Sequence, residues 1–165
     1  MKKLKQNITR ILVAVLVVTS FASCDEVGDT DPGGTSVESM AGDWFITLKD
    51  SDGDLLTSNK LHSTYNTAAN DNTMWIDDHS SGYVIKCKVT VDVKAGTFTA
   101  TASPNVIDSG TVTITDGKIE KGAGTTKGGH KVDKISFRAH FSYDKAGYDI
   151  LYEGHKRTGF KEDEY

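Results

Sequence analysis

Two long segments of this chain alternate between apolar and polar residues, with Val84 as the one exception. They are residues 83–93 and 135–143. Their apolar positions are Tyr83, Ile85, Cys87, Val89, Val91 and Val93 in the first, and Ile135, Phe137, Ala139, Phe141 and Tyr143 in the second. A period of two places alternate side chains on opposite faces of a β-strand. The pattern therefore predicts two strands that each turn an apolar face toward a core.

Shorter segments with strand character continue the pattern. They are residues 44–48, 61–65, 74–77, 98–102, 111–115, 118–120 and 148–155. Glycine-containing turns lie at 94–96 and 145–147, and Asp116-Gly117 is a pair typical of a tight hairpin. No segment sustains the 3.6-residue period of a helix. A meander of this size avoids exposed edges by closing on itself. We therefore predict an all-β fold, an antiparallel up-and-down barrel of about eight strands.

The N-terminus follows a different pattern. Basic residues stand among its first ten positions, an unbroken apolar run covers residues 11–18, and Phe21-Ala22-Ser23-Cys24 follows. This order is typical of a secretory signal peptide. The cysteine resembles that of bacterial lipoprotein signals, where it becomes the lipidated first residue of the mature protein. The resemblance implies that Cys24 is lipidated. One departure is that Phe21 stands where these signals usually have Leu. The run is far shorter than the ~20 residues of a spanning helix, which argues against an uncleaved anchor.

These features predict how the chain is processed and where it resides. Residues 1–23 are expected to be removed, leaving a protein that is exported and lipid-anchored to the bacterial cell envelope, at the outer membrane. Residues 24–40 hold five acidic residues and no basic one, so we expect a flexible tether there. Residues 41–165 are expected to form one barrel domain, as a monomer.

The net charge limits the classes of partner, and the cysteine content limits the chemistry of Cys87. Residues 1–23 contain four of the 19 basic residues and none of the 23 acidic ones, so their removal leaves a formal charge of −8. An acidic protein of this kind is a poor partner for nucleic acid. Cys87 has no disulfide partner if Cys24 carries lipid. Its place in an apolar row predicts a small buried side chain and not a nucleophile.

Two positions resemble a feature of the lipocalins and their calycin relatives. Gly42-Asp43-Trp44 opens the first expected strand, and Arg157 follows the last one. In those families a tryptophan closes one end of the barrel, and an arginine packs over its indole. The resemblance assigns structural roles to Trp44 and Arg157, with the guanidinium stacked on the ring.

A closer resemblance comes from three further segments. They are Tyr65-Asn66-Thr67-Ala68-Ala69-Asn70, Met74-Trp75-Ile76-Asp77-Asp78 and the C-terminal stretch from Gly154 to Tyr165. Together with residues 42–44 they resemble a family of bacterial lipoproteins named lipid-binding putative hydrolases, over most of residues 41–165. The resemblance implies a calycin-type barrel and lipid binding, and suggests hydrolysis. It supplies no catalytic motif.

The residues themselves give no clear catalytic signature. The chain has neither a Gly-x-Ser-x-Gly elbow nor a His-Glu-x-x-His pair, and its five histidines are scattered. Catalytic residues therefore stay unassigned, and no cofactor or metal is expected. A hydrolase acting at the barrel mouth through Asp77, Asp78 and His79 is the alternative, although nothing in the sequence places a nucleophile beside a base.

Apolar inner rows predict a small apolar or lipid-like ligand inside the barrel. The expected ligand-binding residues are Tyr65, Asn66 and Trp75 around a mouth formed by the loop 66–72, with Tyr83, Ile85, Phe137 and Phe141 along the wall. A third possibility is a surface subunit that binds glycans or mediates adhesion. In that case exposed Trp75 and tyrosine rings would stack on sugars.

Overall fold

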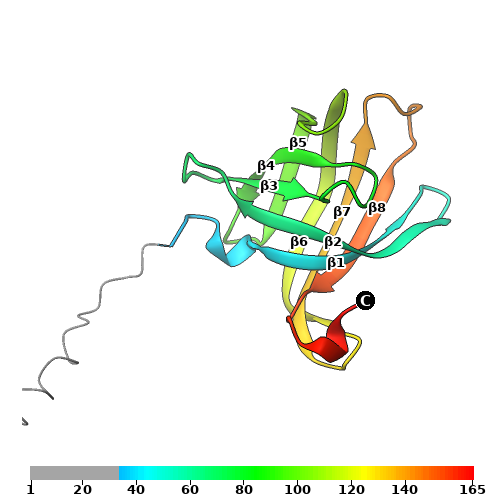
Figure 1. The fold of residues 1–165 in the computed structure, drawn as a ribbon. Coiled ribbons are helices and arrows are strands. Elements are labelled where there is room, and N and C mark those ends of the chain that lie inside the picture. Colours follow the sequence, from blue (N-terminus) through cyan, green and yellow to red (C-terminus); the bar gives the residue numbers. More distant parts are fainter. Residues whose placement is uncertain (1–33) are drawn as a thin grey trace, which may run out of the picture. The chain divides into compact units, whose positions relative to one another are not determined.

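Eight antiparallel strands form a closed barrel in the computed structural model, which describes residues 34–165 (Figure 1). The strands are β1 (Gly42–Lys49), β2 (Leu55–Asn66), β3 (Thr73–Asp77), β4 (Lys86–Asp92), β5 (Thr97–Pro104), β6 (Thr111–Thr125), β7 (Lys131–Phe141) and β8 (Ile150–Lys156). Each strand pairs with the next in sequence, and β8 pairs with β1. The predicted all-β up-and-down barrel is confirmed. The signal peptide and Cys24 lie outside the described residues.

The two alternating segments form strands over most of their length, but Val93 and Tyr143, which were predicted to face inward, lie beyond the strand ends and are 40% and 47% exposed. Cys87, Val89 and Val91 of β4 are buried while their neighbours are more exposed, and β7 shows the same alternation. One difference is that β4 begins at Lys86, because Val84 has a φ of +51° that interrupts the extended backbone. Burial raises the pKa of Cys87 to about 12, so its thiol is inert, as expected.

The predicted hairpin at Asp116-Gly117 is wrong. Strand β6 runs straight through this pair, and the register with β7 shifts between Thr115 and Lys118. Asp116 has a φ of +54°, and a Cβ on Gly117 would lie 2.2 Å from the carbonyl oxygen of Phe98. The pair therefore forms a bulge where β6 passes close to β5. Residue types that favour tight turns also favour bulges.

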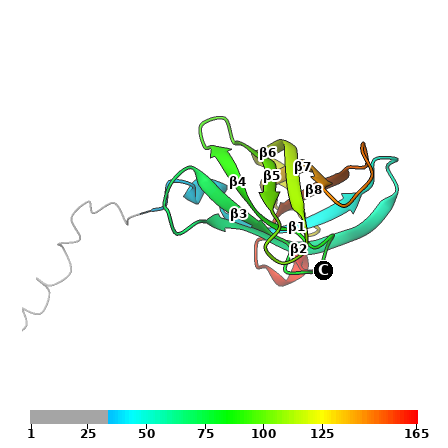
Figure 2. The same cartoon turned by 90° about the horizontal axis from the view of Figure 1, so that it is seen from above.

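Consecutive connections alternate between the two ends of the barrel. One end, the η1 end, carries the 3-10 helix η1 (Glu38–Met40) and the loops 67–72, 93–96 and 126–130. The opposite end, the Asp78 end, carries the loops 50–54, 78–85, 105–110 and 142–149. The C-terminal helix η2 (Lys161–Asp163) lies against the β6–β7 loop, where Gly128 N donates to Asp163 (2.8 Å; Figures 1 and 2). No helix within residues 34–165 is long and apolar enough to cross a membrane.

Trp44 and η1 close the η1 end. The Trp44 side chain is 1% exposed, and its Nε1 donates to Thr64 Oγ1 (2.9 Å), which in turn donates to the Met40 carbonyl (2.7 Å). Val37 and Met40 are buried in the same core. The packed part of the domain therefore begins at Val37, inside the segment that was expected to be tether.

The cation over Trp44 is Lys156, which corrects the predicted Trp44–Arg157 contact. Lys156 lies opposite Trp44 in the β1–β8 register, with its Nζ 5.9 Å from the indole centroid. Gly42 makes room, because a Cβ there would lie 2.8 Å from Lys156 Cε. Successive residues of a strand face opposite sides, so Arg157 lies over Phe45 (5.9 Å) and pairs with Glu164 instead.

Candidate functional site

The interior of the barrel is filled by side chains. Aromatic rings form a series across it: Phe98 packs on Phe137 (5.7 Å between centroids), Phe137 stacks on Tyr152 (4.3 Å), and Tyr152 meets His62 edge-on (5.8 Å). These four side chains are at most 1% exposed, so almost no space the size of a water molecule adjoins them. The lumen around the series is a packed core.

The predicted wall residues take part in this core. Ile85, Phe137 and Phe141 are fully buried. Tyr83 packs on Phe141 (4.9 Å), and its hydroxyl donates to Asp144 (3.2 Å). Burial raises the pKa of Tyr83 to about 12, with a further contribution from the charge of Asp144. A ligand could reach these residues only if neighbouring side chains moved, and their contact with a ligand stays a prediction.

Among residues 34–165, two buried polar atoms at the Asp78 end find no hydrogen-bond partner. They are Nε2 of His62 and the hydroxyl of Tyr152. His62 Nδ1 lies 3.0 Å from the Lys60 carbonyl oxygen, so Nδ1 carries the proton and Nε2 keeps a lone pair. Burial lowers the pKa of His62, although the Lys60 carbonyl and the charge of Asp78 oppose this shift. His62 is therefore held as a neutral imidazole.

Asp78 shapes the loop that covers this end. Its carboxylate accepts the backbone N–H groups of Ser80 (2.9 Å) and Gly82 (3.0 Å), and its side chain is fully buried. A Cβ on Gly82 would lie 2.9 Å from Asp78 Oδ2 and 3.2 Å from His62 Nε2. Only glycine therefore lets the loop approach the barrel so closely.

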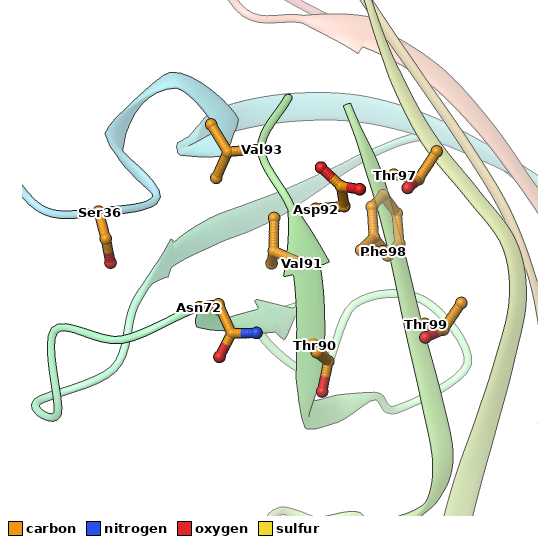
Figure 3. Close-up of a pocket in the computed structure, with 9 residues that line it drawn as sticks. All are labelled: Ser36, Asn72, Thr90, Val91, Asp92, Val93, Thr97, Phe98 and Thr99. Carbon is orange, nitrogen blue, oxygen red and sulfur yellow. The ribbon is translucent and has the colours of Figure 1, made fainter. Parts of the chain in front are cut away.

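An open groove lies at the η1 end, beside the hairpin of β4 and β5 (Figure 3). Its volume is about 590 Å³, and its lining residues are Ser36, Asn72, Thr90, Val91, Asp92, Val93, Thr97, Phe98 and Thr99. Figure 3 shows Val91 and Val93 on the side of β4 that faces Ser36 and Asn72. The backbone N–H of Ser36 donates to Asn70 Oδ1 (3.0 Å), which fixes the start of the domain to the loop 67–72. The groove combines the exposed apolar side chain of Val93 with hydroxyl and amide groups.

The predicted mouth residues lie on the outer face of the barrel. Tyr65 and Trp75 are directly opposite each other on β2 and β3. Lys86 Nζ lies 5.7 Å from the Tyr65 ring, and Lys88 Nζ lies 5.6 Å from the Trp75 ring. Asn66 is exposed and bonds to the Thr67 carbonyl (3.0 Å). Of the loop 66–72, Asn72 is the residue that lines the groove. Ligand contact by Tyr65, Asn66 and Trp75 stays a prediction.

Strand register brings four polar residues into one row across the outer face. Asp43 pairs with Ser63, Ser63 with Asp77, and Asp77 with Lys86. Ser63 Oγ donates to Asp43 Oδ1 (2.6 Å), and Lys86 Nζ lies 2.8 Å from Asp77 Oδ2. His79 extends from the loop 78–85 to this row, with its Nε2 2.8 Å from Ser63 Oγ. A hydroxyl, an imidazole and carboxylates thus meet at one place.

Sequence reasoning singled out Asp77, Asp78 and His79 together, but the structure separates them. Asp77, 6% exposed, belongs to the outer row, whereas Asp78 is fully buried and bonds to the backbone of its own loop. Ser63 and Asp43 were missed, because no short motif connects them to His79. They meet it only through strand pairing, with His79 sixteen residues and Asp43 twenty residues from Ser63.

Comparison with known proteins adds the family. The model of a family described as lipid-binding putative hydrolase matches residues 29–161. The chain belongs to this family. The match covers all eight strands of the barrel and confirms the resemblance drawn from the sequence. A search of curated proteins found no match.

Membership in the lipid-binding putative hydrolase family points to a lipid as the ligand class. Across residues 34–165, no group of three or more His, Cys, Asp or Glu side chains is arranged to hold a metal ion.

Proposed function

We propose that this protein is a cell-envelope lipoprotein that binds a single-chain lipid in the groove at the η1 end. The groove carries the proposal, because its volume of about 590 Å³ lies in the range of sites for small ligands. Membership in a lipid-binding family supports the ligand class.

The lining of the groove favours a particular kind of lipid. Val93, which is 40% exposed, offers apolar surface for an acyl chain, whereas Val91 and Phe98 border the groove but are only 5% and 1% exposed. The nine lining residues include one carboxylate, Asp92, and no basic side chain. An anionic fatty-acid head would be repelled there, whereas a glycerol or phosphocholine head could bond to the threonine hydroxyls. The expected ligands are therefore monoacylglycerols and lysophosphatidylcholine.

The groove also lies beside the start of the described chain. Ser36 lines it, and Ser36 stands twelve positions after Cys24. A chain of that length spans at most about 40 Å when fully extended. A lipidated Cys24 would therefore keep the groove within roughly that distance of a membrane that contains its ligand.

Val93→Asp should weaken lysophosphatidylcholine binding about tenfold or more. Val93 is 40% exposed in the groove, and losing the burial of one valine against the acyl chain removes about 1.5 kcal/mol. Isothermal titration with palmitoyl-lysophosphatidylcholine below its micelle concentration measures the change. Leu55→Asp is the matched control, since Leu55 is 62% exposed at the opposite end. Equal affinities for both variants would contradict binding in the groove.

Cys24→Ser should move the protein from the membrane to the soluble fraction. Lipid chains contribute about 0.8 kcal/mol per buried methylene, and two chains anchor a protein stably. Fractionation of cells and the intact mass of the product measure the result. Cys87→Ala should leave the protein in the membrane, because Cys87 is buried in the core. Membrane retention of Cys24→Ser with an unmodified mass would refute the anchor.

A further inference from the structure

We propose that Ser63, His79 and Asp77 form a hydrolytic centre for carboxylic esters on the outer face of β1–β4. Ser63 is the nucleophile, His79 the general base and Asp77 the residue that orients the base. The proposal does not depend on lipid binding in the groove, whose nine lining residues include none of these three.

Ser63 is held in the middle of the polar row. Its position on β2 lies between Asp43 on β1 and Asp77 on β3, with its side chain on the outer, partly exposed face. Its hydroxyl has two acceptors within reach, Asp43 Oδ1 (2.6 Å) and His79 Nε2 (2.8 Å). One proton can serve only one acceptor, so Asp43 and His79 compete for it. Whenever the proton points to His79, Ser63 is poised for attack.

His79 is held over Ser63 by its loop. Its side chain is 46% exposed, so solvent and substrate can reach it. His79 and Ser80 both have left-handed backbone angles, with φ of +52° and +59°. Such conformations are strained for residues other than glycine, and they persist here because Asp77 and Asp78 bond to the backbone N–H groups of His79 and Ser80. Strain of this kind concentrates at functional sites.

Asp77 completes the arrangement behind His79. Its Oδ1 accepts the His79 backbone N–H (2.9 Å) and lies 3.9 Å from His79 Nδ1. A small rotation of the ring would form a direct bond, as catalytic contacts often tighten when substrate binds. Burial alone would raise the pKa of Asp77, but bonds from Lys86, the His79 N–H and Tyr65 outweigh it and lower the pKa. Asp77 therefore carries the negative charge that stabilises a protonated His79.

The reaction follows from these roles. Ser63 Oγ forms a bond to the acyl carbon of the ester while its proton passes to His79 Nε2. The bond from the acyl carbon to the alcohol oxygen then breaks, and His79 returns the proton to the leaving alcohol. Water gives a proton to His79 Nε2 and attacks the acyl carbon of the acyl-serine. The bond from the acyl carbon to Ser63 Oγ breaks, His79 returns the proton to Ser63 Oγ, and the carboxylic acid is released.

Labelling with a fluorophosphonate tests the nucleophile directly. Ser63 should displace fluoride and gain one phosphonyl group, visible by intact mass and located by peptide mapping. Ser63→Ala should lose the label, and His79→Gln should slow labelling and hydrolysis of p-nitrophenyl butyrate by about 100-fold or more. Ser136→Ala is the matched control, since Ser136 lies on β7 away from the row and should label and hydrolyse like the parent.

Two further measurements distinguish loss of the hydrolytic centre from loss of lipid binding. Asp43→Ala removes the carboxylate that competes with His79 for the Ser63 proton, so the labelling rate at Ser63 should be preserved or increased. If the polar row served only to hold the strands together, removing Asp43 would not speed the labelling of Ser63. Ser63→Ala should lose p-nitrophenyl butyrate hydrolysis while keeping the lysophosphatidylcholine affinity of the parent, because Ser63 does not line the groove. If the parent protein gains no label at Ser63, or if Ser63→Ala hydrolyses the ester as fast as the parent, the hydrolytic centre is refuted even where lipid binding is found.

Discussion

Trp44→Ala should lower the free energy of unfolding by about 3–5 kcal/mol, the range for removing a buried aromatic side chain. Trp44 is 1% exposed and fills the η1 end beneath η1. The substitution also leaves the Thr64 hydroxyl without its indole donor. Urea unfolding followed by circular dichroism measures the loss, because the variant has one tryptophan fewer for fluorescence.

Arg157→Ala distinguishes the observed contacts of Arg157, with Phe45 and Glu164, from the expected contact with Trp44. Arg157 lies on the outer surface, over Phe45 and beside Glu164, so its removal should change stability far less than Trp44→Ala. A loss comparable with that of Trp44→Ala would contradict this placement. It would favour the calycin-like arrangement in which the guanidinium supports the indole.

Acidification should destabilise the domain as the pH falls below about 6.5, the ordinary pKa of histidine. Burial lowers the pKa of His62 in the folded state, so the unfolded chain binds a proton at a higher pH than the folded one does. The contribution of His62 to stability is therefore fully present above its pKa in the unfolded chain, and it is lost as the pH falls toward its lower pKa in the folded protein. A single group contributes at most about 1.4 kcal/mol per pH unit.

His62→Phe should flatten this dependence between pH 7 and pH 5. Phenylalanine does not ionise and can keep the edge-on contact with Tyr152. Burial also lowers the pKa of His155, so that residue accounts for part of the remaining slope. His140→Asn is the control, because His140 lies on the outer face of β7 and should leave the slope in place. An unchanged slope in His62→Phe would contradict the assignment. Urea midpoints at each pH provide the measurement.

Much of the barrel could be predicted because alternation is a local property of each strand. Cys87, Val89 and Val91 were assigned to an inner face from their spacing alone, and all three are buried. The number of strands and their antiparallel order followed from the turns between them. The error at Asp116-Gly117 arose because a bulge and a hairpin use the same residue types.

The candidate site was predicted less completely, because it depends on which residues meet across strands. Asp77 and His79 were recognised as possible catalytic groups, but Ser63 had no sequence signal. Its contact with His79 requires the β2–β3 register and the path of the loop 78–85. Shifting that register by one residue would turn Ser63 into the core and expose Thr64 in its place.

The sequence by itself determined the class of fold, the faces of the strands, the inert character of Cys87 and the family resemblance. These depend on spacing and residue type along short stretches of chain. The tertiary structure alone decided that Lys156 lies over Trp44, that core side chains pack the lumen, and that Ser63 meets His79. Those outcomes depend on register, side-chain volume and loop geometry, which bring together residues that are distant in sequence.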